Sequence, residues 1–257
     1  VLAFVILSRS LPAQEDHRKH KMDFVGSALL MILLSTFVLI ANLAGTVYAW
    51  SSLPVLFLLA LAPMALVGFI SAERRAAEPV MPLDLFRIRN YQAANGVNFL
   101  VGMAMFGTIA FMPLFLQVVT GESATTSGLL ILPLTAGIVA GSVGSGRLTT
   151  TTGRYKVYPI VGTALATVGM YLLSFMHADT PRLASSVYMV MVGLGVGLVM
   201  QVSLLAIQNA ADYRDLGVAT SSAQFFRSMG GSFGVAIFGA IMNARLAVEL
   251  PARIPAE

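Results

Sequence analysis

Cysteine is absent from the chain, and charged residues make up only 11% of it. The lack of cysteine excludes disulfide bonds and metal sites built from thiolates. A soluble domain has about 25% charged residues, so the scarcity of charge argues against a soluble protein. The net charge of +4 does not indicate binding to nucleic acid, because the basic residues lie between apolar stretches rather than along one face.

The few charges leave long uncharged runs between them. No Asp, Glu, Lys or Arg occurs from Phe24 to Ala72. Further runs, of which only the last contains a charge (Arg227), cover residues 90–121, 123–146, 157–178, 183–211 and 216–244. A helix needs about 20 mostly apolar residues to cross a bilayer, and only helices or closed barrels satisfy their backbone there. The runs are too continuous for a barrel, so they predict an all-α polytopic membrane protein.

Seven complete spans fit these runs. The first run is twice the length of one span, and it divides near Tyr48 and Trp50, which suit a membrane interface, and Pro54, which suits a helix start. The predicted spans are 24–47, 53–72, 93–119, 126–146, 157–177, 184–208 and 218–243. Residues 1–7 are apolar and have no basic segment before them, so we expect the end of a truncated eighth span rather than a signal peptide.

Basic residues divide unequally between the two sets of connections. One set holds twelve of the sixteen: Arg9, Arg18, Lys19, Lys21, Arg74, Arg75, Arg87, Arg89, Arg147, Arg154, Lys156 and Arg214. The other set holds Arg182, Arg245 and Arg253. The positive-inside rule assigns the first set, and with it the N-terminal segment, to the cytoplasm. This orientation is the reverse of a seven-helix receptor.

Ionisable residues within spans mark transport paths by default, yet all twelve carboxylates fall in loops or at helix ends. Arg227 is the single candidate for a charge within a span. Its side chain could face a water-filled cavity, or it could extend to the nearby cytoplasmic surface. Gln224, Arg227, Gly231 and Gly234 share one face of the last span, as do Gly193, Gly197, Gln201 and Gln208 on the preceding one.

Two groups of residues follow from these stripes. Buried amides cost free energy unless they are paired, so we expect the polar members to face a cavity or another helix. The candidates for a transport path are Asn98, Gln117, Gln201, Gln208, Gln224 and Arg227, with Asn95 as a weaker one. Glycines four residues apart permit close helix contact, and these are Gly137, Gly141, Gly193, Gly197, Gly230 and Gly234.

The sequence contains no catalytic motif, so an enzyme is not expected and no catalytic residue is assigned. His17 and His20 could be considered as metal ligands, but a solvated basic loop explains them better, and we expect no metal site.

A family resemblance comes from short motifs in a fixed order. Gly146-Arg-Leu148-Thr-Thr150-Thr-Thr-Gly153-Arg154 resembles a cytoplasmic loop of the major facilitator transporters, although Thr150 stands where the family carries Asp. Pro82–Arg87, Phe111–Gln117 and the segment from Gln208 to Gly231 resemble the 14-spanner drug:proton antiporters of the EmrB/QacA type.

The resemblance implies a partial major-facilitator fold. The expected parts are a truncated helix end and basic loop at 1–22, two extra linker helices at 23–72, a cytoplasmic loop at 73–92, five helices of the C-terminal bundle at 93–243, and a tail at 244–257. The missing N-terminal half and last helix would belong to the same transporter. Binding is expected near the midplane, between the two halves.

The function implied is efflux of small amphipathic drugs in exchange for protons, by alternating access. It needs no cofactor beyond the proton gradient, and it places the protein in the bilayer of a bacterial plasma membrane. The family's proton-binding carboxylates belong to the absent half. Two alternatives remain open, namely an exporter of a narrower substrate (a siderophore, a metabolite or a self-made antibiotic) and a truncated membrane protein without transport.

Overall fold

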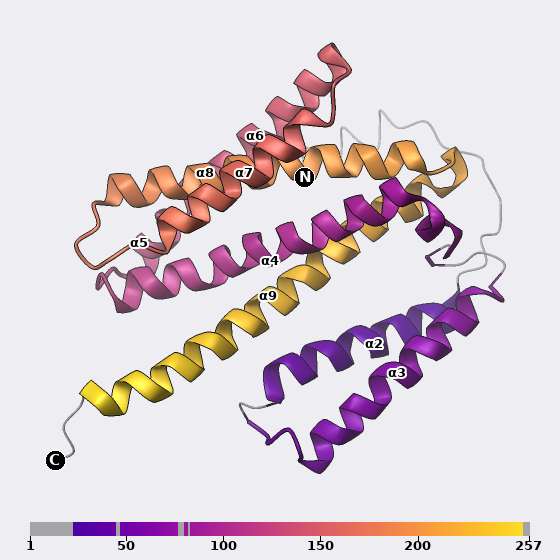
Figure 1. The fold of residues 1–257 in the computed structure, drawn as a ribbon, viewed down its shortest axis with the longest axis horizontal. Coiled ribbons are helices and arrows are strands. Elements are labelled where there is room, and N and C mark those ends of the chain that lie inside the picture. The colour runs from indigo at the N-terminus through magenta and orange to yellow at the C-terminus, as the bar shows by residue number, and fades with distance from the viewer. Residues whose placement is uncertain (1–22, 45–46, 77–79, 82, 254–257) are drawn as a thin grey trace, which may run out of the picture.

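The computed structural model describes residues 23–44, 47–76, 80–81 and 83–253. The predicted truncated span, the basic N-terminal loop, His17 and His20 lie outside these residues. Within them every regular element longer than an isolated bridge is helical, which confirms the all-α fold class. In chain order the elements are α2 (Phe24–Leu43), α3 (Leu53–Glu73), η1 (Leu83–Arg87), α4 (Arg89–Val118), α5 (Ala124–Leu129), α6 (Leu132–Thr152), α7 (Val157–Leu173), α8 (Arg182–Ala210), η2 (Tyr213–Asp215) and α9 (Leu216–Arg253) (Figure 1).

Six helical stretches in the described part are long and apolar enough to cross a membrane. They match the six predicted spans from 53–72 onward, with α5 and α6 together forming one of them. The seventh, α2, is a shorter apolar helix that ends at Leu43 rather than at the predicted residue 47. It ends there because Ala44 adopts extended backbone and forms an isolated bridge with Tyr48.

The predicted motif loop is mostly helical, which corrects its description as a turn from Gly146 onward. Helix α6 continues to Thr152, and the hydroxyls of Thr150 and Thr151 donate to the Arg147 carbonyl oxygen at 2.7 and 3.1 Å. Such back-bonding to the previous turn lets threonine remain in a helix. The chain reverses at Gly153, whose φ of 67° is the left-handed conformation that favours glycine.

The predicted tail is also partly helical. Helix α9 does not end near residue 243 but continues to Arg253, so it is 38 residues long. The prediction from hydrophobicity ended this helix too early, because a helix can continue beyond the hydrocarbon core into polar residues.

The helices form two groups. Helix α8 packs between α6 and α7 and also contacts α4, while α4 crosses the long helix α9 (Figure 1). Helices α2 and α3 form a hairpin beside this bundle, and their contact with it includes Phe37 of α2 and Phe233 of α9, whose ring centroids lie 5.7 Å apart. Helices α7, α8 and α9 run in alternating directions, as successive spans of a polytopic membrane protein must (Figure 1).

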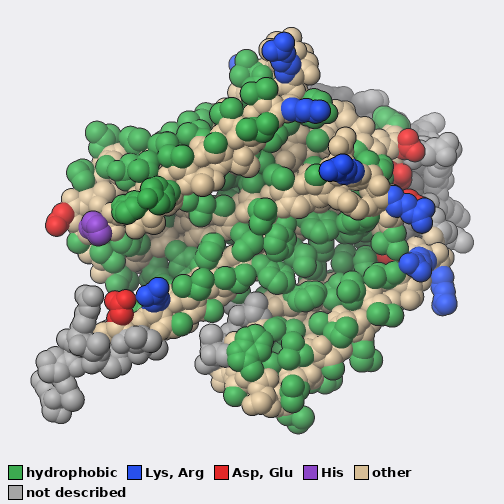
Figure 2. Space-filling model, in the orientation of Figure 1, with side chains coloured by type: hydrophobic (Ala, Val, Ile, Leu, Met, Phe, Trp, Pro, Cys, Tyr) green, Lys and Arg blue, Asp and Glu red, His purple; other side chains and the backbone are tan. Residues whose placement is uncertain are grey.

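The surface agrees with a lipid environment. Hydrophobic side chains cover much of the visible face, whereas blue side chains gather at the helix ends (Figure 2). Many large hydrophobic side chains are exposed, and Leu53 and Leu183 are 81% and 76% exposed. So large an exposed apolar surface is unfavourable in water but favourable in the hydrocarbon of a bilayer. The protein is therefore a multi-pass membrane protein.

Candidate functional site

Three close crossings between helices hold the bundle together, and each depends on glycine. At the first, a methyl group added at Gly137 of α6 would lie 2.7 Å from the Val190 carbonyl oxygen, and one at Gly141 would lie 2.5 Å from that of Leu194. The facing residues Gly193 and Gly197 of α8 are equally restricted by the backbone of α6. Glycine is required here because the two backbones touch.

The second crossing joins α4 to α9. Gly230 faces the Phe99 carbonyl group, and a methyl added at Gly234 would lie 2.7 Å from the Met103 Cα. The structure thus places all six glycines expected to pack helices at helix crossings. Sequence reasoning missed Gly102, which faces the Arg227 backbone, because Gly102 has no glycine four residues away.

A third set of glycines joins α7 to α8. A methyl at Gly162 would lie 2.7 Å from the Gly195 carbonyl oxygen, and one at Gly195 would lie 2.5 Å from the nitrogen of Ala166. The spacing of Gly193, Gly195 and Gly197 indicates this contact, because residues two apart on a helix lie on different sides. Gly193 and Gly197 face α6, whereas Gly195 faces α7.

A polar seam lies where α4, α8 and α9 meet. The Tyr91 hydroxyl of α4 donates to Ser222 Oγ of α9 at 2.7 Å. The Gln208 amide of α8 donates to Thr220 Oγ1 of α9 at 3.1 Å. Asn98 of α4 is 2% exposed, and its amide nitrogen has no hydrogen-bond partner among the described residues. Of the predicted path residues, Asn98 and Gln208 thus belong to interfaces made by α4, α8 and α9.

The other predicted glutamines lie away from the polar seam. Gln117 lies near the opposite end of α4, where its amide donates to Ser127 Oγ at 2.9 Å. Gln201 lies beside Gly146 at the contact of α6 and α8, with its Cγ 3.5 Å from where a methyl on that glycine would be. Gln224 is exposed, while Gly231 and Gly234 on its predicted stripe pack against α4. The stripe is therefore not one cavity wall.

Arg227 occupies the crossing of α4 and α9 through its backbone, and its side chain is half-buried. Its guanidinium makes no hydrogen bond or ion pair with any described residue. Arginine carries five donors in a planar fork, so a half-buried one without a partner has unused binding capacity. Both the cavity and the surface interpretation of this residue remain predictions.

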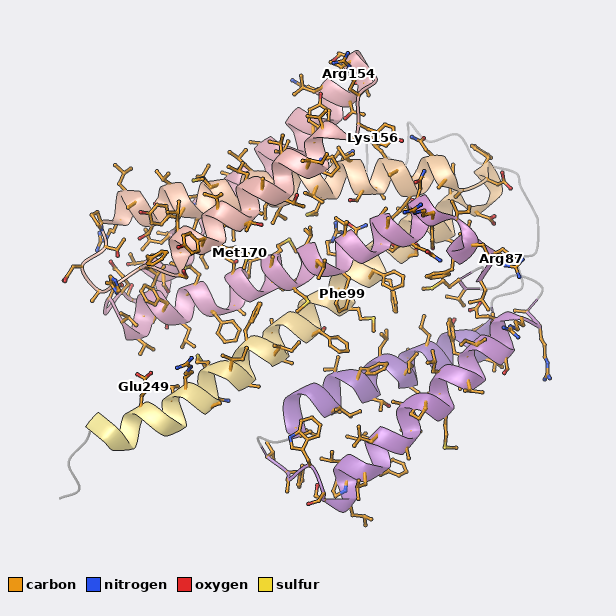
Figure 3. All side chains as sticks on the ribbon, viewed as in Figure 1. Arg87, Phe99, Arg154, Lys156, Met170 and Glu249 are labelled. Atoms are coloured by element: carbon orange, nitrogen blue, oxygen red, sulfur yellow. The ribbon has the colours of Figure 1, made fainter. Side chains whose placement is uncertain are left out.

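A recess of about 580 Å³ opens between the first turns of α4 and α7 and the last turns of α8. Its polar lining comes from Asn90, Lys156, Ser203 and Asn209, and none of the predicted path residues lines it. Lys156 and the exposed Arg154 lie at this end of the bundle (Figure 3). Sequence reasoning missed Asn90, Ser203 and Asn209 as lining residues because they come from separate helices, whereas Arg154 was predicted as part of the motif loop.

No group of three or more His, Asp or Glu side chains in the described ranges is arranged to hold a metal ion. The polar groups at the seam are amides and hydroxyls, which can bind uncharged or weakly polar molecules but supply no nucleophile activated by a base. The arrangement suits binding rather than covalent chemistry.

No family model matches the chain. The chain is similar to known proteins, among them an uncharacterized MFS-type transporter of Mycobacterium tuberculosis, which is 39% identical over 241 residues, 94% of this chain and 35% of that protein. The multidrug transporter protein MdtP of Bacillus subtilis is 36% identical over 245 residues, with coverage of 95% and 45%. A tetracycline resistance determinant of Streptomyces rimosus is 34% identical over 224 residues, with coverage of 87% and 64%.

This chain therefore spans between a third and two thirds of the length of these relatives. The matched residues make up 87–95% of this chain. Six helical stretches in the described part are long and apolar enough to cross a membrane, and these relatives include an MFS-type transporter and a multidrug transporter. Over nearly its whole length the chain is therefore similar to membrane transporters of the major facilitator superfamily.

Proposed function

We propose that the chain is part of an efflux transporter that exports small amphipathic molecules in exchange for protons. The observation that carries the proposal is a bundle held by glycine crossings around a polar seam, in a chain whose similar proteins include a multidrug transporter. Glycine crossings let neighbouring helices pack closely within a membrane, which suits a bundle that rocks as one rigid body during alternating access.

The chain supplies one of the two helix bundles of such a transporter. Alternating access moves two bundles around a central site, and the described helices form one bundle and an accompanying hairpin. The second bundle belongs to the N-terminal part of the complete transporter. Proton-binding carboxylates belong to that part also, and the energy source is the proton gradient of the plasma membrane, with the N-terminal segment of this chain on the cytoplasmic side.

The test uses MdtP, of which this chain matches 45%. An efflux-deficient bacterium would express this chain, the unmatched segment of MdtP, or both, and ethidium accumulation would be followed by fluorescence. We expect the two segments together to lower ethidium accumulation and a protonophore to abolish this decrease. Either segment alone should leave ethidium accumulation unchanged. If both segments reach the membrane but ethidium accumulation is unchanged, the transporter exports a narrower substrate. If this chain alone lowers ethidium accumulation, the proposal that transport needs both segments is wrong.

A further inference from the structure

The recess of about 580 Å³ between the ends of α4, α7 and α8, named here the end recess, has two kinds of lining. Apolar side chains line it a turn or more inside the helix ends, and these are Ala93, Val97, Ile160, Val202 and Ala206. Polar side chains lie mostly at the helix ends themselves, and these are Asn90, Lys156, Asn209 and, further inside, Ser203. A volume of this size is within the range of small-molecule sites.

Ser203 is the buried polar member of this lining. It is 4% exposed, and its hydroxyl makes no hydrogen bond with any described residue. The other buried serines of the described part differ, because each donates to a nearby backbone carbonyl oxygen: Ser127, Ser145, Ser185 and Ser222. The Ser203 oxygen is not closed off by its neighbours, so the hydroxyl is available to a molecule in the end recess.

The charge around the end recess is positive. Lys156 lines it, is exposed, and forms no ion pair with any described residue. Arg154 lies at the tip of the projecting α6–α7 end, and Lys156 lies nearer to α8 (Figure 3). None of the lining residues is Asp or Glu, and Asp212, which follows α8, does not line the recess. The field at this end of the bundle therefore attracts an anion.

The apolar lining indicates what carries the anion. A free phosphate ion would contact only the polar residues and would leave Val97 and Val202 without a partner. A phospholipid has a charged phosphate and acyl chains in one molecule, and basic recesses between membrane helices bind such headgroups. Ile160 of the lining is 69% exposed, so the apolar part of the recess is open toward the surface that contacts lipid.

We propose that the end recess binds one anionic phospholipid from the leaflet that this end of the bundle faces. The phosphate lies against the Lys156 ammonium group and accepts from the amides of Asn90 and Asn209. An ester carbonyl oxygen accepts from the Ser203 hydroxyl, and an acyl chain lies along Val97. This site is separate from the polar seam, and lipid binding there does not rest on the proposed efflux function.

Native mass spectrometry of the full chain in detergent tests the proposal. Dioleoyl phosphatidylglycerol and dioleoyl phosphatidylcholine, which differ in net charge but have the same acyl chains, would be titrated separately. We expect the first phosphatidylglycerol to bind saturably and more tightly than phosphatidylcholine. Lys156→Gln should weaken phosphatidylglycerol binding about fivefold, the effect of one cation near an anionic headgroup, and leave phosphatidylcholine binding unchanged.

Three further variants locate the lipid. Arg154→Gln removes the same charge from a residue that does not line the end recess, so it should change phosphatidylglycerol binding less than twofold. Ser203→Ala should weaken binding of both lipids a few-fold, because both contain the ester group. Ala93→Phe places a ring in the recess from an exposed lining position, so it should block both lipids without disturbing the fold.

Equal losses of phosphatidylglycerol binding in Lys156→Gln and Arg154→Gln would show diffuse attraction to a basic surface and would overturn the proposal. Unchanged binding in Lys156→Gln overturns it as well. Glycerol 3-phosphate has the same charged group without acyl chains, so its displacement of phosphatidylglycerol at equal concentration would show an anion site rather than a lipid site. None of these outcomes bears on whether the complete transporter exports ethidium.

Discussion

The Tyr91 hydroxyl on α4 reaches Ser222 on α9 at 2.7 Å, although the two residues are 131 positions apart in the chain. Both side chains are buried, and the Ser222 hydroxyl itself donates to the Ala219 carbonyl oxygen at 2.8 Å. This short chain of hydrogen bonds joins the first turns of α4 to the first turns of α9. It holds the two helices together at the end of the bundle where Arg89 begins α4.

Tyr91→Phe should lower stability modestly, by about 0.5–1.5 kcal/mol, because it removes one hydrogen bond without leaving a cavity. Thermal unfolding in detergent measures the change. Ser222→Ala and the double variant complete a mutant cycle, and the double variant should lose less than the sum of the two single ones. Strict additivity would contradict a direct interaction.

Gly193→Ala should destabilise the contact of α6 and α8. Its methyl would overlap the Leu134 carbonyl group, and overpacking of this kind costs about 1–3 kcal/mol. Gly144→Ala is the matched control, because an added methyl there meets no atom within 4 Å and alanine favours the helix. We expect opposite shifts of the thermal midpoint, and a lower midpoint for both variants would show that the crossing is not special.

Arg182→Gln should weaken the link between the α4–α5 connection and the first residue of α8. Arg182 lies 2.5 Å from a Glu122 oxygen, and the Glu122 side chain is 14% exposed, so the variant leaves a poorly solvated carboxylate. Because Arg182 itself is largely exposed, the loss should be about 1 kcal/mol or less. Adding Glu122→Gln should restore the thermal midpoint, and a further decrease would contradict this account.

Arg227→Lys should impair efflux by the complete transporter nearly as much as Arg227→Ala, at equal membrane levels. The guanidinium offers a fixed fork of donors, whereas lysine offers a point charge. Ethidium efflux and immunoblotting of membranes measure the two quantities. Full efflux with lysine would show that any long cation reaching the surface suffices.

The sequence predicted the helices well because a bilayer permits few alternatives to a continuous apolar helix. It also predicted the glycine crossings at Gly137 and Gly193, since spacing by four fixes a common face. The hydrogen bond between Tyr91 and Ser222 could not be predicted from the sequence, because no local pattern shows which residues of distant helices face each other. The helix through Thr150 was missed because glycine and threonine favour turns elsewhere, whereas here the hydroxyls of Thr150, Thr151 and Thr152 bond back to their own helix.

The most direct test concerns the orientation of the helices in the membrane, on which the rest of the account depends. The chain has no cysteine, so Thr152→Cys and Asp179→Cys each introduce one label site, at opposite ends of α7. A membrane-impermeant maleimide added to intact cells should label the Asp179→Cys variant at once and the Thr152→Cys variant only after permeabilisation. Labelling of both variants in intact cells, or of Thr152→Cys alone, would contradict the cytoplasmic placement of the basic loops.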